Sequence, residues 1–447
     1  MPASVDAHRP APTPPDTRRV TRAAIASFLG STLEYYDFYI YASASALVFG
    51  KVFFPAANPA TGTLLSLATF GVAYIARPVG AVILGHFGDR VGRKRIMLLT
   101  VTAMGSATFL IGCLPSYRTA GVLAPILLVI LRVLQGISAA GEQSGAGSLT
   151  LEHAPAGRRA FFTSWTLTGT QAGFILATMV FLVVADLPDR QLISWGWRIP
   201  FWCSVVVVVL AYVVRRRLEE PEVFRAEQRS DAIAKFPVAQ LLRTQPADLL
   251  RVVLCSFIAV VSTVFAVFGL AFATGHAVGV SKTTMLLVAV AANVLALIMQ
   301  PLLAILADRI GRRPVFISGV IGCGIMIFVY FTAIMSGDTL LIYLAALILI
   351  GVCYSAPNAV WPTFYAEMFA TRVRFSGMAI GTQIGFALAG FAPTIAWTLV
   401  GNSRTHWLPV AILVAVACAL SAAAAFTARE TYRTPLTELG TPSARSE

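Results

Sequence analysis

The sequence consists mainly of long apolar runs separated by short segments that carry most of the charges. About 20 apolar residues suffice for a helix to cross a bilayer. In hydrocarbon, backbone amides have to be satisfied within their own segment, which favours helices. The predicted spans are residues 23–49, 62–85, 96–114, 120–146, 160–186, 193–214, 249–275, 284–306, 314–335, 338–365, 375–400 and 405–427. The fold class predicted for the chain is therefore an all-α membrane protein with twelve transmembrane helices.

The composition argues against a soluble globule and against a nucleic-acid-binding protein. Of the 447 residues, 57% are hydrophobic and 12% are charged, whereas about 25% of the residues in a soluble globular domain are charged. The net charge of +13 comes from short clusters between apolar runs and does not form the water-exposed basic face that binds nucleic acid. We therefore expect the lipid bilayer as a partner, and no nucleic acid.

One loop pattern occurs twice in the chain. Residues 85–95 read Gly-His-Phe-Gly-Asp-Arg-Val-Gly-Arg-Lys-Arg, and residues 307–314 read Ala-Asp-Arg-Ile-Gly-Arg-Arg-Pro. A second repeated mark is a glutamate followed by an arginine, at Glu152 and Arg159 and again at Glu367 and Arg374. The offsets between the copies are about 215 to 219 residues, close to half the chain. We therefore predict two six-helix halves that are pseudo-repeats of one unit.

The expected divisions of the chain follow from these spans. They are a disordered tail at 1–22, an N-terminal bundle at 23–214, a linker at 215–248, a C-terminal bundle at 249–427 and a tail at 428–447. Lys and Arg gather at one end of the spans, and such residues favour the cytoplasmic side. We expect a monomer in the cell membrane with both termini and the linker in the cytoplasm. The tail after Glu430 is polar and of low complexity, and it needs no function.

Charged residues inside a span are costly and are therefore candidates for function. Glu34 and Asp37 are three residues apart and Tyr41 follows them, so helical spacing places all three on one face. Two carboxylates this close in a poorly solvated position favour the binding of a proton, as a proton carrier requires. The alternative is that one of them permanently neutralises a nearby arginine.

The fourth span carries Arg132, Gln135, Ala139 and Glu142 along one stripe. A buried arginine keeps its proton, so it needs a carboxylate or an anionic ligand as its partner. Competition between the carboxylate and the anionic ligand for the arginine would couple proton binding to ligand binding. Arg77 on the second span is another candidate for this role, with a structural ion pair as the alternative. The residues predicted to couple protons are Glu34, Asp37, Arg132 and Glu142.

Uncharged polar side chains at membrane depth predict a central polar cavity. They include Gln171, Asn293, Gln300, Asn358 and Gln383, and each is either a ligand contact or an interhelical hydrogen bond. Asn358 lies between two prolines, where a bent helix exposes backbone groups to a cavity. The predicted substrate-binding residues are Tyr36, Tyr41, Arg77, Arg132, Gln135, Gln171, Asn358 and Trp361.

The repeated loop is the predicted gate. Its glycines permit a tight turn, and Asp89 can accept hydrogen bonds from the start of a helix. Arg90 and Arg93 can reach carboxylates or helix C-termini of the other half. Such contacts close the cytoplasmic side, and the alternative is a mere topological anchor. The predicted gating residues are Gly85, Asp89, Arg90, Gly92, Arg93, Asp308, Arg309 and Arg312.

No motif indicates a cofactor, a metal or an enzyme. The six cysteines lie singly in apolar runs, as small buried hydrophobes do. The sequence contains no phosphate-binding G-x-x-x-x-G-K-[ST] loop, no H-E-x-x-H pair and no nucleophile elbow. These observations disfavour an ATP-driven pump and a membrane enzyme, and the lack of a repeated filter loop disfavours an ion channel.

Several of these segments resemble a known family. Gly85, Asp89, Arg90, Gly92, Arg93, Lys94 and Arg95 match the loop signature of the major facilitator superfamily, and Arg132, Gln135 and Gly136 resemble its fourth-helix motif, which is associated with proton coupling. More narrowly, the chain resembles the metabolite:proton symporter family at residues 33–38, 76–78, 195–201, 367–369 and 374–377. It departs from that pattern at Tyr35, where tryptophan is usual, and at Ala140-Gly141-Glu142, where Gly-Gly-Glu is usual.

The resemblance implies a small-molecule substrate and protons as partners. It implies proton-coupled uptake of a small organic acid, such as shikimate or a di- or tricarboxylate. The two halves would rock about a site near the midplane, which gives alternating access. The alternative is a proton-coupled osmolyte symporter for proline or glycine betaine, because a zwitterion also presents a carboxylate to arginine.

Overall fold

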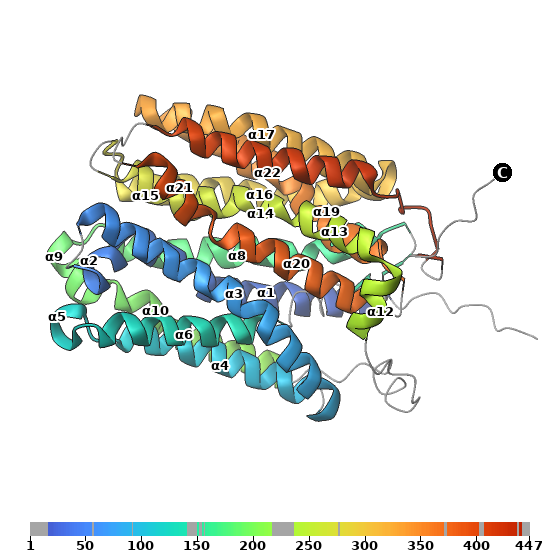
Figure 1. Cartoon of the computed structure of the whole chain (residues 1–447), viewed down its shortest axis with the longest axis horizontal. Coiled ribbons are helices and arrows are strands. Elements are labelled where there is room, and N and C mark those ends of the chain that lie inside the picture. Colours follow the sequence, from blue (N-terminus) through green and yellow to red (C-terminus); the bar gives the residue numbers. More distant parts are fainter. Residues whose placement is uncertain are drawn as a thin grey trace, which may run out of the picture.

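The protein is described from a computed structural model (Figure 1). The described residues are 17–55, 58–91, 93–140, 150–151, 154–155, 157–216, 237–275, 278–370, 373–401, 406–435 and 438–439. Within them, all regular secondary structure is helical, and eight helices are long and apolar enough to cross a membrane. Two shorter apolar helices lie at Thr102–Cys113 and Leu123–Ala139.

The described part of the N-terminal half holds six long helices. They are α1 (Thr17–Leu47), α3 (Pro59–Val91), α4 (Arg93–Cys113), α6 (Leu123–Ala139), α8 (Arg159–Ala185) and α10 (Arg198–Arg216). Short elements lie between them: α2 (Phe49–Phe53), α5 (Tyr117–Ala120), α9 (Asp189–Gln191) and the π-helical turn η1 (Leu192–Gly196). Each of the six predicted spans of this half overlaps one long helix.

The C-terminal half repeats the pattern, with more interruptions. Its first crossing is a series of α13 (Pro246–Cys255), η2 (Ser256–Ile258), α14 (Ala259–Thr263), η3 (Val264–Gly269) and α15 (Leu270–Ala273). The others are α16 (Lys282–Ile310), α17 (Arg312–Ser336), α18 (Thr339–Ala346) with η4 (Leu347–Tyr354) and α19 (Ser355–Glu367), α20 (Arg374–Gly390) with α21 (Ala392–Val400), and α22 (Leu408–Thr427). A short helix, α12 (Pro237–Thr244), precedes them.

The twelve crossings form two bundles that lie side by side, with the N-terminal half in blue to green and the C-terminal half in yellow to red (Figure 1). We call the end of the bundles where α1 begins and α22 ends the termini side, and the end that carries α2, α5 and α9 the far side. The halves pack against each other chiefly along α8 with α16 and along α3 with α20. This architecture confirms the predicted fold of twelve helices in two halves.

Glycines set how closely the helices around the centre approach. A Cβ on Gly169 would lie 2.2 Å from the Phe28 carbonyl oxygen, and one on Gly173 would lie 2.5 Å from the Thr32 carbonyl oxygen. Such distances exclude any side chain at these positions of α8 unless α1 moves away. The contact fixes the side chains of α1 relative to those of α8, which line the same cavity.

Candidate functional site

A cavity lies between the two halves near the middle of the helices. Its lining includes the described residues Tyr35, Tyr39, Tyr74, Arg77, Thr170, Gln171, Asn293, Tyr354, Asn358, Trp361 and Tyr365. Its volume is about 60 Å³, well below the range of about 300–1,000 Å³ that is typical of ligand pockets. The halves have to move apart before a substrate of several carbon atoms can enter.

Arg77 is the one charged residue among the described lining residues. Its Nη2 lies 3.9 Å from Oε1 of Glu34, and both side chains are almost fully buried. The guanidinium also lies over the rings of Phe38, at 4.4 Å from the centroid, and Tyr74, at 5.0 Å. An ion pair at this distance is longer than a hydrogen bond, so the pair leaves room for a second anionic partner of the arginine.

Arg132 lies among aromatic rings and neutral oxygens. Its guanidinium carbon lies 3.9 Å from the ring centroid of Tyr41 and 4.4 Å from that of Phe38. It donates hydrogen bonds to Gln135 Oε1 at 3.0 Å and to the Phe70 carbonyl at 3.2 Å. Among the described residues, aromatic faces and neutral oxygens surround this guanidinium. Pairing of Arg132 with a carboxylate or an anionic ligand stays a prediction.

The other acidic residue of α1, Asp37, is buried in the same half. It lies against Thr108, whose hydroxyl accepts a hydrogen bond from Gln135 at 2.7 Å. Asp37, Thr108, Gln135 and Arg132 thus form a continuous polar cluster behind the cavity. Glu34, Asp37 and Arg132 are each at most 5% exposed.

The structure separates the eight predicted substrate-binding residues into two groups. Arg77, Gln171, Asn358 and Trp361 line the cavity. Tyr36, Tyr41, Arg132 and Gln135 are buried but are not among the lining residues: the Tyr36 hydroxyl donates to the Pro200 carbonyl and the Tyr41 hydroxyl to Thr69. Contact with a substrate stays a prediction for all eight.

The sequence analysis did not predict most of the aromatic residues that line the cavity, which we call the aromatic wall. Tyr35 and Tyr39 on α1, Tyr74 on α3, and Tyr354 and Tyr365 near α19 line the cavity. A signal was present, since Tyr35 and Tyr39 are four residues apart and Tyr74 precedes Arg77 by three, which places each pair on one helix face. The same spacing occurs in helices that only pack, so the pattern could not identify the wall by itself.

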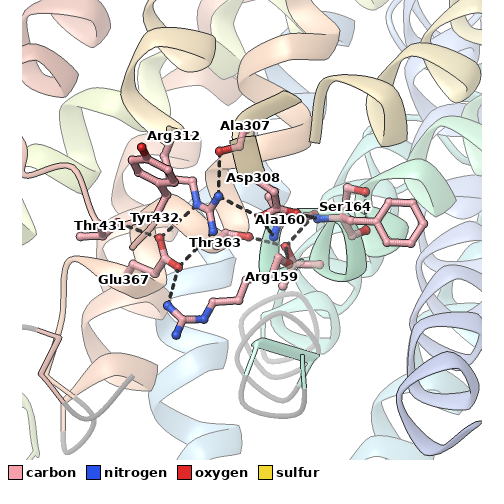
Figure 2. A network of polar contacts seen from close by, with 12 residues as sticks. Arg159, Ala160, Ser164, Ala307, Asp308, Arg312, Thr363, Glu367, Thr431 and Tyr432 are labelled. Carbon is pink, nitrogen blue, oxygen red and sulfur yellow. Dashed lines mark hydrogen bonds and ion pairs between the residues drawn. The ribbon is translucent and has the colours of Figure 1, made fainter. Parts of the chain in front are cut away.

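A network of buried charges joins the halves on the termini side (Figure 2). Its centre is Glu367, which accepts from Arg312 Nε at 3.2 Å and from Arg159 Nη1 at 3.3 Å. Thr431 also donates to Glu367, at 2.7 Å. Arg159 belongs to α8 of the N-terminal half and the other three residues to the C-terminal half, so the network bridges the two.

Asp308 forms a second bridge at the same place. Its two carboxylate oxygens accept the backbone N–H groups of Ala160 and Phe161, each at 3.0 Å, and Arg312 Nη1 donates to Oδ1 at 2.8 Å (Figure 2). The first N–H groups of a helix lack intrahelical partners and attract negative charge. The carboxylate therefore holds the start of α8 against the end of α16.

The predicted gating residues fall into three groups. Asp308 and Arg312 belong to the network, whereas Arg309 is exposed and takes no part in it. The structure does not describe Gly92 or the side chains of residues 85–98. The predictions at Gly85, Asp89, Arg90 and Arg93 therefore lie outside the described residues. Glu142 also lies outside them. Sequence reasoning noted Arg159 and Glu367 as repeat marks but did not assign them to a gate.

The C-terminal tail also takes part in the contacts on the termini side. The Glu430 carboxylate accepts the backbone N–H groups of Arg312 and Arg313, each at 2.9 Å, and the Thr434 carbonyl accepts from Arg159 at 2.9 Å. The positive end of α17 thus binds the tail carboxylate. Residues 430–434 therefore hold the start of α17 and the arginine of the opposite half.

The far side is joined by exposed polar contacts. Asp189 in α9 binds Lys51 Nζ at 3.1 Å and Lys282 Nζ, from the other half, at 2.6 Å. Asp186 accepts from Thr283, and Trp397 Nε1 donates to the Ala60 carbonyl at 3.1 Å. Hydrogen bonds from Lys282 and then Lys51 lower the pKa of Asp189 below its ordinary value.

The fold and the site define a class: a membrane transporter of the major facilitator type, with a midplane cavity between two halves and contacts that close both ends. A model of the family described as "Sugar (and other) transporter" matches residues 23–235 and 218–441. The chain belongs to this family, and its members are transporters rather than enzymes.

Relatives with curated descriptions narrow the comparison. The chain is 38% identical over 422 residues to the shikimate transporter of Escherichia coli (strain K12), covering 93% of this chain and 96% of that one. It is 32% identical over 431 residues to the proline/betaine transporter of the same strain, covering 94% and 86%. These relatives confirm the resemblance to the metabolite:proton symporter family.

Solved structures agree on the fold. The xylose transporter XylE from E. coli, in a partially occluded inward-open conformation, matches with a TM-score of 0.72 at 19% identity and covers 93% of this chain and 99% of its own. A crystal structure of a D-xylose-proton symporter matches with a TM-score of 0.73 at 18% identity, over 93% of this chain and 98% of that one.

Proposed function

We propose that the protein is a proton-coupled symporter for the uptake of a small organic acid. The observation that carries this proposal is Arg77, a buried cation in the cavity wall with Glu34 at 3.9 Å as its counterion. A substrate carboxylate can replace Glu34 on the arginine. The similarity to the shikimate transporter supports this substrate class.

Substrate binding is coupled to proton binding because the substrate displaces the Glu34 carboxylate from Arg77, and a displaced buried charge is costly in free energy. When a substrate carboxylate takes Arg77, Glu34 is left as a buried carboxylate without its counterion, and such a charge is far more costly than the neutral acid. Binding of a proton by Glu34 therefore accompanies binding of the substrate. Asp37, three residues further on the same helix, is the second candidate carrier, and Arg132 and Gln135 support it through the polar cluster.

The cavity favours an acid with one negative charge and several hydroxyl groups. With Arg77 as the one charged group among the described lining residues, a di- or tricarboxylate would bury charges without partners. Thr170, Gln171, Asn293 and Asn358 supply neutral hydrogen-bonding groups around it. We therefore favour a shikimate-like monoanion over citrate-like substrates.

A second candidate is an osmolyte symporter, and the aromatic wall is the observation that favours it. Tyrosine and tryptophan faces attract quaternary ammonium groups, and Tyr35, Tyr39, Tyr74 and Trp361 surround the cavity beside Arg77. A betaine would place its carboxylate on the arginine and its ammonium group among the rings. The similarity to the proline/betaine transporter supports this alternative.

We also infer the arrangement in the cell. The clustering of Arg and Lys on the termini side favours the cytoplasm for both chain ends and for residues 215–248. Residues 23–214 and 249–427 would then move as two units within one monomer, closed on the cytoplasmic side by the Glu367 network.

Reconstituted uptake tests the proposal directly. Proteoliposomes are given labelled shikimate, 2-oxoglutarate, citrate, proline or glycine betaine, with and without an acidic exterior. We expect shikimate uptake that an acidic exterior accelerates and a protonophore abolishes. Uptake of betaine and proline alone would favour the osmolyte symporter, and uptake unaffected by the proton gradient would refute proton coupling.

Variants assign the proton carrier. Glu34→Gln or Asp37→Asn should abolish uphill accumulation and spare exchange of substrate down its gradient, because a neutral amide cannot carry the proton. Arg77→Lys should weaken substrate binding, since a point charge replaces a planar fork. Arg190→Lys, an exposed site on the far side, is the matched control and should change nothing. Unchanged accumulation in either acidic variant removes that residue from the proton path.

A further inference from the structure

Gln300 is a fully buried amide that the site described above does not use. It is 0% exposed, and neither its Oε1 nor its Nε2 has a hydrogen-bond partner among the described residues. Buried polar groups in native proteins are nearly always paired, so an unpaired amide calls for an explanation. An amide that is unpaired in one conformation and paired in another is one such explanation.

The position of Gln300 in the fold indicates what that other partner is. Asn293, seven residues earlier on α16, lines the cavity, and seven residues are close to two helical turns, so both side chains lie on one face. Gln300 therefore lies about 10 Å beyond Asn293 towards the termini side. Asp308, further along the same helix, belongs to the contacts that close that side.

The opposite wall of this path is also polar. Helices α8 and α16 lie antiparallel, since Asp308 binds the start of α8 and Thr283 contacts Asp186 just after its end. Between the cavity and the network, the Thr163 hydroxyl of α8 contacts the Thr363 hydroxyl of α19. The interface between the halves thus contains a pair of neutral hydroxyl groups between the cavity and the termini side, although it is closed.

We propose that Gln300 is a transient binding site for the substrate on its way between the cavity and the termini side. When α8 and α16 separate there, the amide Nε2 donates to the carboxylate of the passing substrate and Oε1 accepts from a hydroxyl. This inference rests on the proposed transport of a carboxylate. The amide is unpaired while the termini side is closed, and it is hydrated when that side opens. Its hydration therefore favours the open state of the termini side.

The first test compares substrate affinity on the two sides. Gln300→Leu keeps the volume and removes the polar group. Ser421→Ala on α22 is the control, since Ser421 is also a buried polar residue and α22 packs against α17 and α13 of its own half. Half-saturation is measured for labelled shikimate in vesicles of each orientation. We expect Gln300→Leu to raise the value on the termini side about tenfold, in line with the loss of a charge-assisted hydrogen bond, and to leave the far side within about twofold.

Gln300→Asn should restore part of the affinity, because it returns a shorter amide. Equal half-saturation in Gln300→Leu and wild type, or an equal rise on both sides, would overturn the proposal. If the wild type carries glycine betaine and not shikimate, the proposed substrate class has failed. The same variants are then assayed with glycine betaine, whose carboxylate the amide would equally bind.

A second test needs no substrate. A cysteine placed at Ala304, one turn beyond Gln300 and fully buried, is introduced into a background whose six native cysteines are replaced. A membrane-impermeant thiol reagent is applied from the termini side. We expect Gln300→Leu to slow the modification about tenfold, because it removes the unpaired amide that favours opening. An unchanged rate would contradict the proposal, and thermal melting confirms that each variant is folded.

Discussion

The two ends of this transporter are closed by contacts of the same chemistry in opposite environments. On the termini side, Glu367 and Arg312 are 0% exposed at their side chains, whereas on the far side Lys51 and Asp189 are 54% and 59% exposed. A buried charge that loses its partner is costly, while an exposed pair contributes only about 0–1 kcal/mol. We infer that specific residues hold the termini side and that general packing holds the far side.

The largest effect is expected from removing the centre of the buried network. Glu367→Ala leaves Arg159 and Arg312 buried without their shared carboxylate, which should destabilise the closed termini side by about 3–5 kcal/mol. Spin labels at the exposed positions Arg158 and Arg309 would report a longer distance across that side. Asp338→Asn, which keeps an N-cap on the far side, is the control. An unchanged distance distribution would remove the network from gate closure.

A smaller effect is expected from Arg312→Lys. The guanidinium bonds Glu367 through Nε and Nη2, and Asp308 and the Ala307 carbonyl through Nη1, and an ammonium group cannot span these positions. We expect a loss of about 2 kcal/mol, seen with the same pair of labels. Arg243→Lys on the exposed face of α12 is the control and should leave the distance between the labels unchanged. Equal behaviour of the two variants would show that charge alone is sufficient at position 312.

Glu430→Gln tests the contribution of the tail. The amide nitrogen that replaces one carboxylate oxygen cannot accept the N–H of Arg313, and the favourable charge at the start of α17 is lost. We expect a loss of about 1 kcal/mol, measured as a fall in melting temperature and a partial opening of the termini side. A full opening, as in Glu367→Ala, would mean that the tail and not Glu367 holds the network.

The smallest effect is expected on the far side. The pKa of Asp189 is lowered while Lys282 and Lys51 bind it, so its contribution is complete above the ordinary aspartate pKa of about 3.9. That contribution is lost only as the pH falls through the lowered value. Labels at Arg190 and Thr339 should therefore show no change between about pH 5 and pH 8, and high salt or Asp189→Asn should shift the population by less than about 1 kcal/mol. Opening of the far side near pH 6 would contradict the conclusion that the ion pairs of Asp189 persist down to its lowered pKa.

Much of the fold could be predicted because hydropathy is a local property. A run such as residues 314–335 is too long and too apolar for anything but a crossing, and the structure has α17 there. Boundaries were less secure: the span predicted to begin at 193 opens with a π-helical turn, and α10 begins at Arg198. Side-chain packing decides such details.

The site was predicted in part. Charges inside spans pointed to Arg77 and Glu34 because any buried charge is conspicuous in an apolar run. The partner of Arg132 could not be predicted, since Phe38, Tyr41 and Phe70 are ordinary apolar residues in sequence and become its neighbours only through packing.

By itself, the sequence determined that this chain crosses a membrane many times, that it contains two related halves and that a few ionisable groups are held at membrane depth. Each of these follows from residue type and spacing along the chain. The tertiary structure decided that Arg159 meets Glu367, a contact between residues 208 positions apart, and that the tail returns to cap α17. Contacts of this range depend on how two bundles dock, and no local pattern encodes the docking.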